Sequence, residues 1–200
     1  MTDDQFERWK AEREVDSVKL SNGEKLILKM LCELYEHLKV QGDIDPKLVE
    51  SAICYGHSWA LRHTYPGIFG DEERDPAAVS EVFDILGMYR RIQQSYERLT
   101  DEEKQRVKTE AGPFSDDIQF DGFDARTEKD HFSIAQFAIK HFGQFPELKV
   151  RSLDSHHPTL VTYRRMLSAF KSHEVSRSNR DVGVVALIRI LKGEKPPVPH

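Results

Sequence analysis

At the centre of the chain stands the stretch Phe120-Asp121-Gly122-Phe123-Asp124-Ala125-Arg126-Thr127-Glu128. Gly122 can adopt a positive φ, which would let the two phenylalanines turn inward from a short loop. Asp124 has the side chain of an N-cap, and Thr127 and Glu128 would then occupy the first turn of a helix. The stretch therefore predicts a docked turn that leads into a capped helix.

The helix predicted after this turn carries one apolar face together with Asp130 and His131. Its apolar residues recur at positions i, i+1, i+4 and i+8, which is typical of a helix face that packs on a core. These residues are Ile134, Ala135, Ala138 and Phe142. Gly143 and Pro146 follow, and they end the helical pattern.

Other segments of the chain also show helical signals rather than strand signals. Ser21 and Glu24 form a predicted capping box, as do Thr100 and Glu103. The first box opens a helix with an apolar stripe at 3.6-residue spacing. The stripe consists of Ile27, Met30, Leu31, Leu34, Tyr35 and Leu38. Because no polar–apolar alternation persists for a whole strand, we expect an all-α, multihelical single domain of about seven to eight helices.

Asp45 and Pro46 are predicted to cap and open a helix that continues through Ala60. Near the C-terminus, Pro158 is predicted to begin a helix that is followed by a loop over residues 172–178, and Asn179 to begin a last helix. These signals place one helix after another along most of the chain.

The composition of the 200 residues is that of a soluble globular protein. Hydrophobic residues make up 38% of the chain and charged residues 32%, and no apolar run approaches the ~20 residues that span a bilayer. Cys32 and Cys54 lie within helical apolar patterns, so we expect buried thiols in a reducing compartment. The acidic N-terminus lacks the features of a secretory signal. We therefore predict a cytoplasmic protein with no membrane segment.

The net charge of −5 conceals an asymmetry along the chain. Residues 149–200 hold ten Lys and Arg against four Asp and Glu, which gives +6. The preceding 148 residues hold 19 basic against 30 acidic side chains, which gives −11. A chain with such ends is suited either to contact a polyanion or to pair head-to-tail with its own acidic surface. An ordinary solvated surface is the third interpretation.

Several distant patches resemble the YfbU domain, a family of bacterial proteins. They are Ser21–Leu28, Phe83–Tyr89, Phe120–Glu128 and Tyr163–Leu167. The last two resemble the family patterns G-F-D-A-x-T-E and Y-x-R-M-L. The resemblance runs from about Leu20 to about Lys171. It implies a multihelical cytoplasmic fold, and it does not supply a catalytic mechanism.

The resemblance divides the chain into three expected parts. Residues 1–19 form an N-terminal extension that is partly helical, and residues 20–171 form the YfbU-like helical domain. Residues 172–200 form a basic helix and a proline-rich tail that packs on the domain or extends from it.

A metal site has little support in the sequence. Glu128 and His131 have the i, i+3 spacing of helical metal ligands, but a di-iron site needs a second Glu-x-x-His, and the chain has none. We therefore expect no metal and no cofactor. The chain also lacks the common nucleophile and phosphate-loop motifs. An enzyme remains an alternative, with an acid and histidine site formed by Asp124, Asp130 and His131.

The first alternative to a module without catalysis, with an enzyme as the second, is binding of nucleic acid or another polyanion through the basic C-terminal helices. The candidate residues are Arg164, Arg165, Lys171, Arg177 and Arg180. Their clustering favours phosphate contact. The acidic overall charge and the absence of a known nucleic-acid-binding motif argue against it.

The function that we predict is a self-associating interaction or regulatory module without catalysis. Opposite charges at the two ends of the chain favour a homo-oligomer, and a different protein partner is the other possibility. Aromatic residues in loops either dock on the core or form a contact surface. They are Tyr65, Phe69, Phe114 and Phe120.

Overall fold

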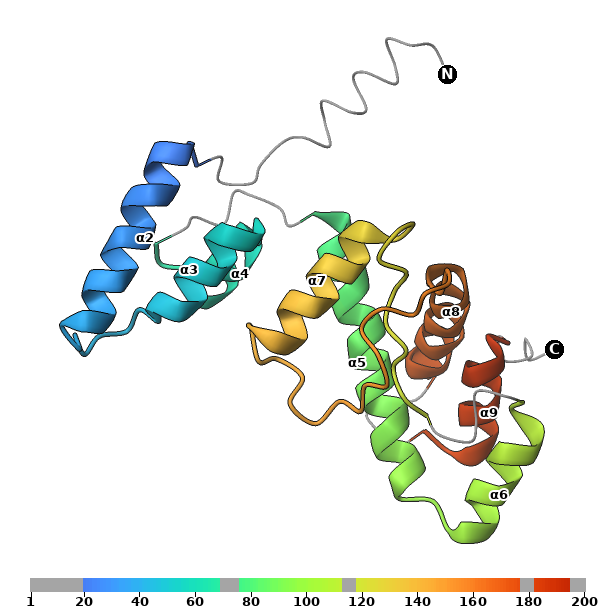
Figure 1. Ribbon diagram of the computed structural model, residues 1–200. Coiled ribbons are helices and arrows are strands. Elements are labelled where there is room, and N and C mark those ends of the chain that lie inside the picture. The colour runs from blue at the N-terminus through green and yellow to red at the C-terminus, as the bar shows by residue number, and fades with distance from the viewer. Residues whose placement is uncertain (1–19, 69–75, 113–117, 177–181, 195–200) are drawn as a thin grey trace, which may run out of the picture. The chain divides into compact units, whose positions relative to one another are not determined.

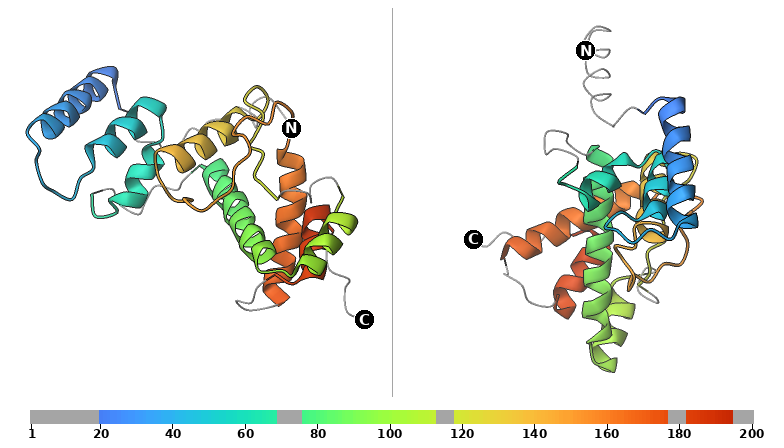
Figure 2. Two further views of the ribbon diagram at one scale, coloured as in Figure 1. Left: turned by 60° about the horizontal axis from the view of Figure 1, so that its bottom comes forward. Right: turned by 90° about the vertical axis from the view of Figure 1, so that its left-hand side faces the viewer.

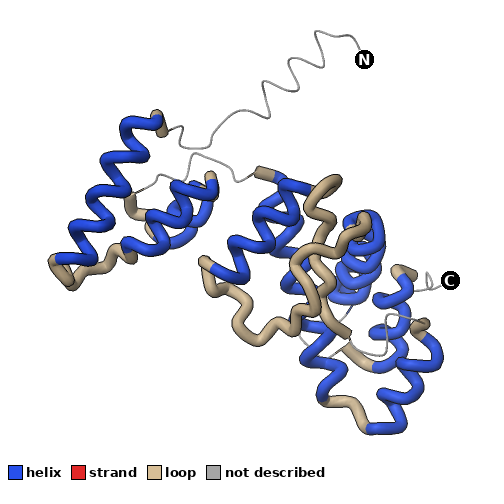
Figure 3. Tube along the Cα trace, viewed as in Figure 1, coloured by secondary structure: helices blue, strands red, loops and turns tan. Residues whose placement is uncertain are grey.

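The computed structural model describes residues 20–68, 76–112, 118–176 and 182–194 (Figure 1). These ranges contain eight helices and, as Figure 3 shows, no strand. The helices are α2 (Asn22–His37), α3 (Pro46–Tyr55), α4 (Ser58–Thr64), α5 (Ala77–Glu97), α6 (Asp101–Glu110), α7 (Lys129–Lys140), α8 (Leu160–Ser176) and α9 (Val184–Lys192). The prediction of an all-α, multihelical fold is therefore confirmed.

The helices group into two compact units. The first unit comprises the described residues up to Ala77 together with Lys140–Phe142, and it contains α2, α3 and α4. The second comprises the described residues from Ala78 to Ile139 and from Gly143 onward. The boundary at Ala77 lies inside the span 20–171 that the sequence predicts to be one helical domain.

The helix starts of the first unit follow the predicted capping signals. The Ser21 hydroxyl accepts a hydrogen bond from the Glu24 N–H at 3.3 Å, and the Glu24 carboxylate accepts one from the Ser21 N–H at 2.8 Å. Asp45 caps α3 by accepting hydrogen bonds from the N–H groups of Lys47 and Leu48. Both predicted caps are confirmed.

The helix predicted from Pro46 to Ala60 is interrupted, so that prediction is wrong. Gly56 has a φ of 74°, a left-handed conformation that ends α3, and α4 begins at Ser58. Glycine adopts this conformation without a steric penalty from Cβ.

The core of the first unit lies between α3 and α4. Its buried apolar side chains are Leu48, Ala52, Ile53, Trp59, Ala60 and Leu61. The ring of Phe142 packs edge-on against Trp59, with ring centroids 5.4 Å apart. Helix α2 contributes only one buried residue, Cys32. Most of the apolar stripe predicted on this helix is therefore left outside the core.

The second unit is built around α5, the longest of the described helices. Seven of its apolar residues are buried: Val79, Val82, Ile85, Leu86, Met88, Tyr89 and Ile92. Helix α9 lies beside α8 and also contacts α6 (Figure 2). The capping box of Thr100 and Glu103 at the start of α6 is confirmed.

Two boundaries in the second unit differ from the sequence prediction. The helix predicted from Pro158 begins at Leu160 and continues to Ser176, so the predicted loop is wrong over residues 172–176. Helix α9 begins at Val184, whereas a start at Asn179 was predicted; residues 177–181 lie outside the described ranges.

Both cysteines are free thiols. Cys32 is buried, as predicted, but Cys54 is exposed, so the prediction of a buried thiol is wrong for Cys54. In the part of the chain that the structure describes, no helix is both long and apolar enough to cross a membrane.

Candidate functional site

The turn at Gly122 has the geometry that the sequence predicts. Gly122 has a φ of 77°, and a Cβ atom at this position would lie 2.0 Å from the carbonyl oxygen of Leu153. Only glycine fits here without a shift of the backbone. Phe120 and Phe123 are fully buried on either side of it. The prediction of an inward-facing aromatic turn is confirmed.

The two phenylalanines belong to a cluster of aromatic rings between α5 and α8. The Phe120 ring lies 5.3 Å from that of Tyr89, and the Phe123 ring lies 5.5 Å from that of Tyr163. Both contacts are edge-on, the geometry that aromatic pairs prefer. Burial raises the pKa of Tyr89 and of Tyr163 above the usual value of a phenol, so both hydroxyls are neutral.

Asp124 serves the turn rather than the helix. Its buried carboxylate accepts hydrogen bonds from the Thr127 hydroxyl at 2.6 Å and from the Arg126 N–H at 3.1 Å. These two donors lower the pKa of Asp124. Helix α7 begins only at Lys129, so the prediction that Asp124 caps it is wrong. A turn over residues 125–127 intervenes, and Asp124 caps this turn.

Glu128 connects the turn to the start of α8. One carboxylate oxygen accepts hydrogen bonds from the N–H groups of Thr159 and Leu160, at 3.0 and 2.7 Å. The other accepts from the Asp124 N–H at 3.0 Å and the Thr159 hydroxyl at 3.2 Å. Glu128 was predicted only to occupy the first turn of the helix after Asp124, so its connection to α8 was not predicted.

His131 joins α7 to an ion pair between α5 and α8. Its Nε2 lies 2.7 Å from a carboxylate oxygen of Glu81. Arg164 donates two hydrogen bonds to the same carboxylate, from Nε at 2.6 Å and from Nη2 at 2.9 Å. Chiefly because of Arg164, and also because of His131, the pKa of Glu81 falls to about 2. We call Glu81, His131 and Arg164 the three-helix cluster.

The three candidate catalytic residues have different surroundings. The carboxylate of Asp124 is bound within its turn, Asp130 is exposed on α7, and His131 contacts Glu81. Among the described residues, no group of three or more His, Cys, Asp or Glu side chains is placed to hold a metal ion. The contacts of Asp124 and His131 account for both side chains through folding.

The candidate polyanion-binding residues do not form one free basic surface. Arg164 is paired with Glu81, and Lys171 is paired with Asp84 at 2.5 Å. Arg165 lines a pocket of about 350 Å³ near the end of α9, together with Lys192. Arg177 and Arg180 lie outside the described residues.

The loop aromatics also have different positions. Phe120 is buried, so it docks on the core. Tyr65 is half-buried, and its hydroxyl accepts a hydrogen bond from the Asp45 N–H at 2.7 Å. Phe69 and Phe114 lie outside the described residues. Phe120 is thus excluded as a contact residue, whereas Tyr65 lines an apolar groove of the first unit.

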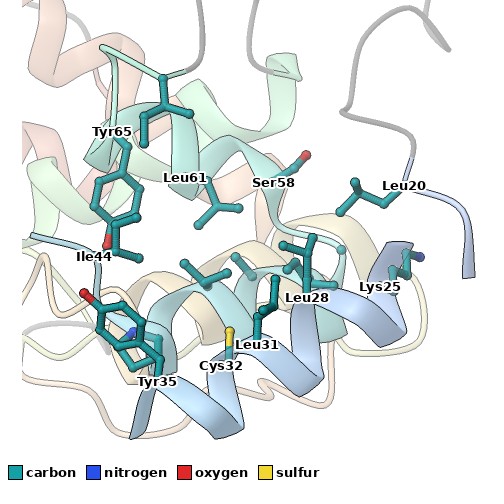
Figure 4. A pocket seen from close by; sticks show the side chains of 16 residues that line it. Leu20, Lys25, Leu28, Leu31, Cys32, Tyr35, Ile44, Ser58, Leu61 and Tyr65 are labelled. Carbon is teal, nitrogen blue, oxygen red and sulfur yellow. The ribbon is translucent and has the colours of Figure 1, made fainter. Parts of the chain in front are cut away.

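The first unit contains an apolar groove of about 530 Å³ between α2, α3 and α4. Its lining is largely aliphatic and aromatic, and includes Leu28, Leu31, Cys32 and Tyr35 from α2, Val49, Ala52 and Ile53 from α3, and Leu61 from α4. Figure 4 shows Lys25 and Ser58 toward one end of the groove, and Tyr35 and Tyr65 toward the other. The groove is open to solvent and has few polar groups.

A second apolar surface lies on another face of α2. Four side chains at helical spacing are more than half exposed: Ile27 at 58%, Met30 at 56%, Leu34 at 53% and Leu38 at 68%. We call these four residues the outward stripe. Among the described residues, twelve large apolar side chains are exposed, and ten of them belong to the first unit. The exposed apolar surface is therefore concentrated on this unit.

Comparison with known families agrees with the resemblance inferred from the sequence. A family model described as the YfbU domain matches residues 18–183. The matched span contains α2 to α8 and ends just before α9. It includes the aromatic turn, the three-helix cluster, the groove and the outward stripe.

Proposed function

Since the chain belongs to the YfbU domain family, we propose that it is an interaction or regulatory module that self-associates and works without catalysis. The outward stripe of α2 is the contact surface. The observation that carries this proposal is the exposure of four large apolar side chains at helical spacing on a helix with one buried residue. Contiguous apolar patches on soluble proteins usually mark a contact with another molecule.

The size of the stripe bears on how strong this contact is. Burial of the exposed half of such a side chain yields roughly 1 kcal/mol. Four residues on each of two copies then yield on the order of 8 kcal/mol, whereas association costs about 4–15 kcal/mol in lost freedom of motion. The stripe alone supports weak association, so a firm dimer needs further buried surface.

The two alternatives have less support. Polyanion binding is less well supported because two of its candidate residues are already paired with acids of α5. Arg164 pairs with Glu81, and Lys171 pairs with Asp84. A catalytic site would need Asp124 and His131 to leave the contacts that hold the turn and the three-helix cluster.

Size-exclusion chromatography with light scattering on the full chain tests the proposal. Leu34→Glu places a charge in the outward stripe, and Asn22→Glu places the same charge on an exposed, polar position of the same helix. We expect Leu34→Glu to shift the protein to monomer and Asn22→Glu to leave its mass unchanged. Equal masses for both variants and the unaltered chain would contradict the proposal.

A further inference from the structure

We propose that the partner of α2 is α2 of a second copy, lying antiparallel, so that the outward stripe of each copy fills the groove of the other. Leu31 then lies on the two-fold axis between the copies. This inference rests on the proposed function, because it assumes self-association. It adds the identity of the docking element, its direction and its centre.

The position of Leu31 on α2 is the first support. The groove receives one row of α2 side chains, Leu28, Cys32 and Tyr35, and the outward stripe forms another row. At about 100° per residue, Leu31 falls between the two rows. It lines the groove and is still 53% exposed. An interface that covers both rows is therefore centred on Leu31.

Symmetry is the second support. In a two-fold interface the same surface of both copies is self-complementary. An antiparallel pair centred on Leu31 places Ile27 opposite Tyr35 of the partner subunit, and Leu28 opposite Leu34 of the partner subunit. Each of these pairs joins one outward residue to one groove residue. A parallel pair would instead place Ile27 against its own equivalent and leave both grooves unfilled.

Charge along α2 also favours the antiparallel direction. The N-terminal half carries Lys25 against Glu24, together with Lys29, which pairs with Glu33 and Glu50 of its own copy. The C-terminal half carries Glu33 and Glu36 and no lysine or arginine. The helix dipole adds positive charge to the first end and negative charge to the second. An antiparallel pair brings unlike ends together, and a parallel pair brings like ends together.

Two other occupants of the groove are possible outcomes of the test. A volume of about 530 Å³ lies in the usual range of small-molecule pockets. The chain also has 19 residues before Leu20, which itself lines the groove. Neither a small molecule nor residues 1–19 would cover both the outward stripe and the groove through one symmetric contact. We therefore favour a second copy of the chain.

Disulfide cross-linking of the full chain tests the direction and centre of the pair. In a Cys32→Ala, Cys54→Ala background, Leu31→Cys places a thiol on the predicted axis, where symmetric thiols meet within disulfide distance. We expect covalent dimers on mild oxidation. Leu38→Cys in the same background should give no covalent dimer, because in an antiparallel pair the two substituted positions lie at opposite ends of the interface.

The outcomes separate this inference from the proposed function. A monomeric chain in light scattering would overturn both. A dimer that cross-links through Leu38→Cys as readily as through Leu31→Cys would show parallel helices, and a dimer that cross-links at neither position would show another contact surface. Either dimer result would overturn the inference and leave self-association intact.

Occupancy of the groove is tested from α3, away from the outward stripe. Val49→Glu places a charge in the groove, whereas Lys47→Glu changes an exposed charge on the same helix. We expect Val49→Glu to weaken dimerisation at least tenfold and Lys47→Glu to have no effect. If Val49→Glu does not fold, Ser58→Glu at the first position of α4 provides the second groove variant. Unchanged dimerisation in a folded groove variant would overturn the inference and point to residues 1–19 or a small molecule.

Discussion

A carboxylate oxygen of Glu128 lies 2.7 Å from the backbone nitrogen of Leu160, the first residue of α8, and accepts its hydrogen bond. The same carboxylate also accepts a hydrogen bond from the backbone N–H of Asp124, four residues earlier in the chain. It also carries a negative charge to the N-terminus of a helix, where unpaired N–H groups and the helix dipole favour an acid. The family signature at this turn is therefore explained by its role in joining two distant segments.

Replacement of Glu128 should destabilise the protein strongly. We expect Glu128→Ala to lower the free energy of unfolding by about 2–4 kcal/mol, because it leaves partly buried N–H groups without their charged acceptor. Asp130→Ala, two residues away and exposed, should change it by less than about 0.5 kcal/mol. Urea unfolding of both variants checks this. Similar losses for the two would contradict the role that we assign to Glu128.

Gly122 should tolerate no side chain. We expect Gly122→Ala to cost more than about 4 kcal/mol or to prevent folding, because its Cβ would lie 2.0 Å from the Leu153 carbonyl oxygen. Gly143 is a matched control, since it also has a positive φ, of 63°, but no atom within 4 Å of an added Cβ. Gly143→Ala should cost about 1–2 kcal/mol, the strain of the left-handed conformation alone. Thermal and urea unfolding compare the two, and equal costs would rule out the steric explanation.

The three-helix cluster should make stability depend on pH in the acidic range. The pKa of Glu81 is about 2 in the folded protein, below its ordinary value of 4.5. The unfolded chain therefore binds this proton first as the pH falls, and the stabilisation present above pH 4.5 is lost between pH 4.5 and about 2. The full loss is less than about 3 kcal/mol, because Arg164 is more than half exposed and solvent screens the pair.

Glu81→Gln tests this dependence. We expect the variant to be less stable than the unaltered chain at neutral pH and to lose less stability between about pH 5 and pH 2. Asp84→Asn is the control, because it removes another acid of α5 whose exposed pair with Lys171 is worth less than about 1 kcal/mol. Urea unfolding at a series of pH values measures both. If the free energy of unfolding fell equally steeply below pH 5 in Glu81→Gln and in the unaltered chain, Glu81 would not be the source of the pH dependence.

Much of the local structure could be predicted because its interactions span only a few residues. The capping boxes at Ser21 and Thr100 each join residues three positions apart, and both are present. The left-handed turn at Gly122 was predicted from its glycine and flanking aromatics, and it is present as well. Signals of this kind lie wholly within a short window of sequence.

The contacts that define the candidate sites span much longer distances in the chain. Glu128 and Thr159 are 31 residues apart, and Glu81 and Arg164 are 83 residues apart. Neither helical periodicity nor a capping pattern predicts a pair of residues this far apart. The stripe on α2 illustrates the same limit, since spacing predicts an apolar face but not whether that face meets the core or another molecule.

The proposed function requires that the first unit joins two copies of the chain. Sedimentation equilibrium of the unaltered full-length protein, from low to high micromolar concentration and in both low and moderate salt, measures this directly. We predict a monomer–dimer equilibrium that persists in moderate salt, because an apolar contact surface is not screened by ions. A single monomeric mass at every concentration and in both salts would contradict self-association.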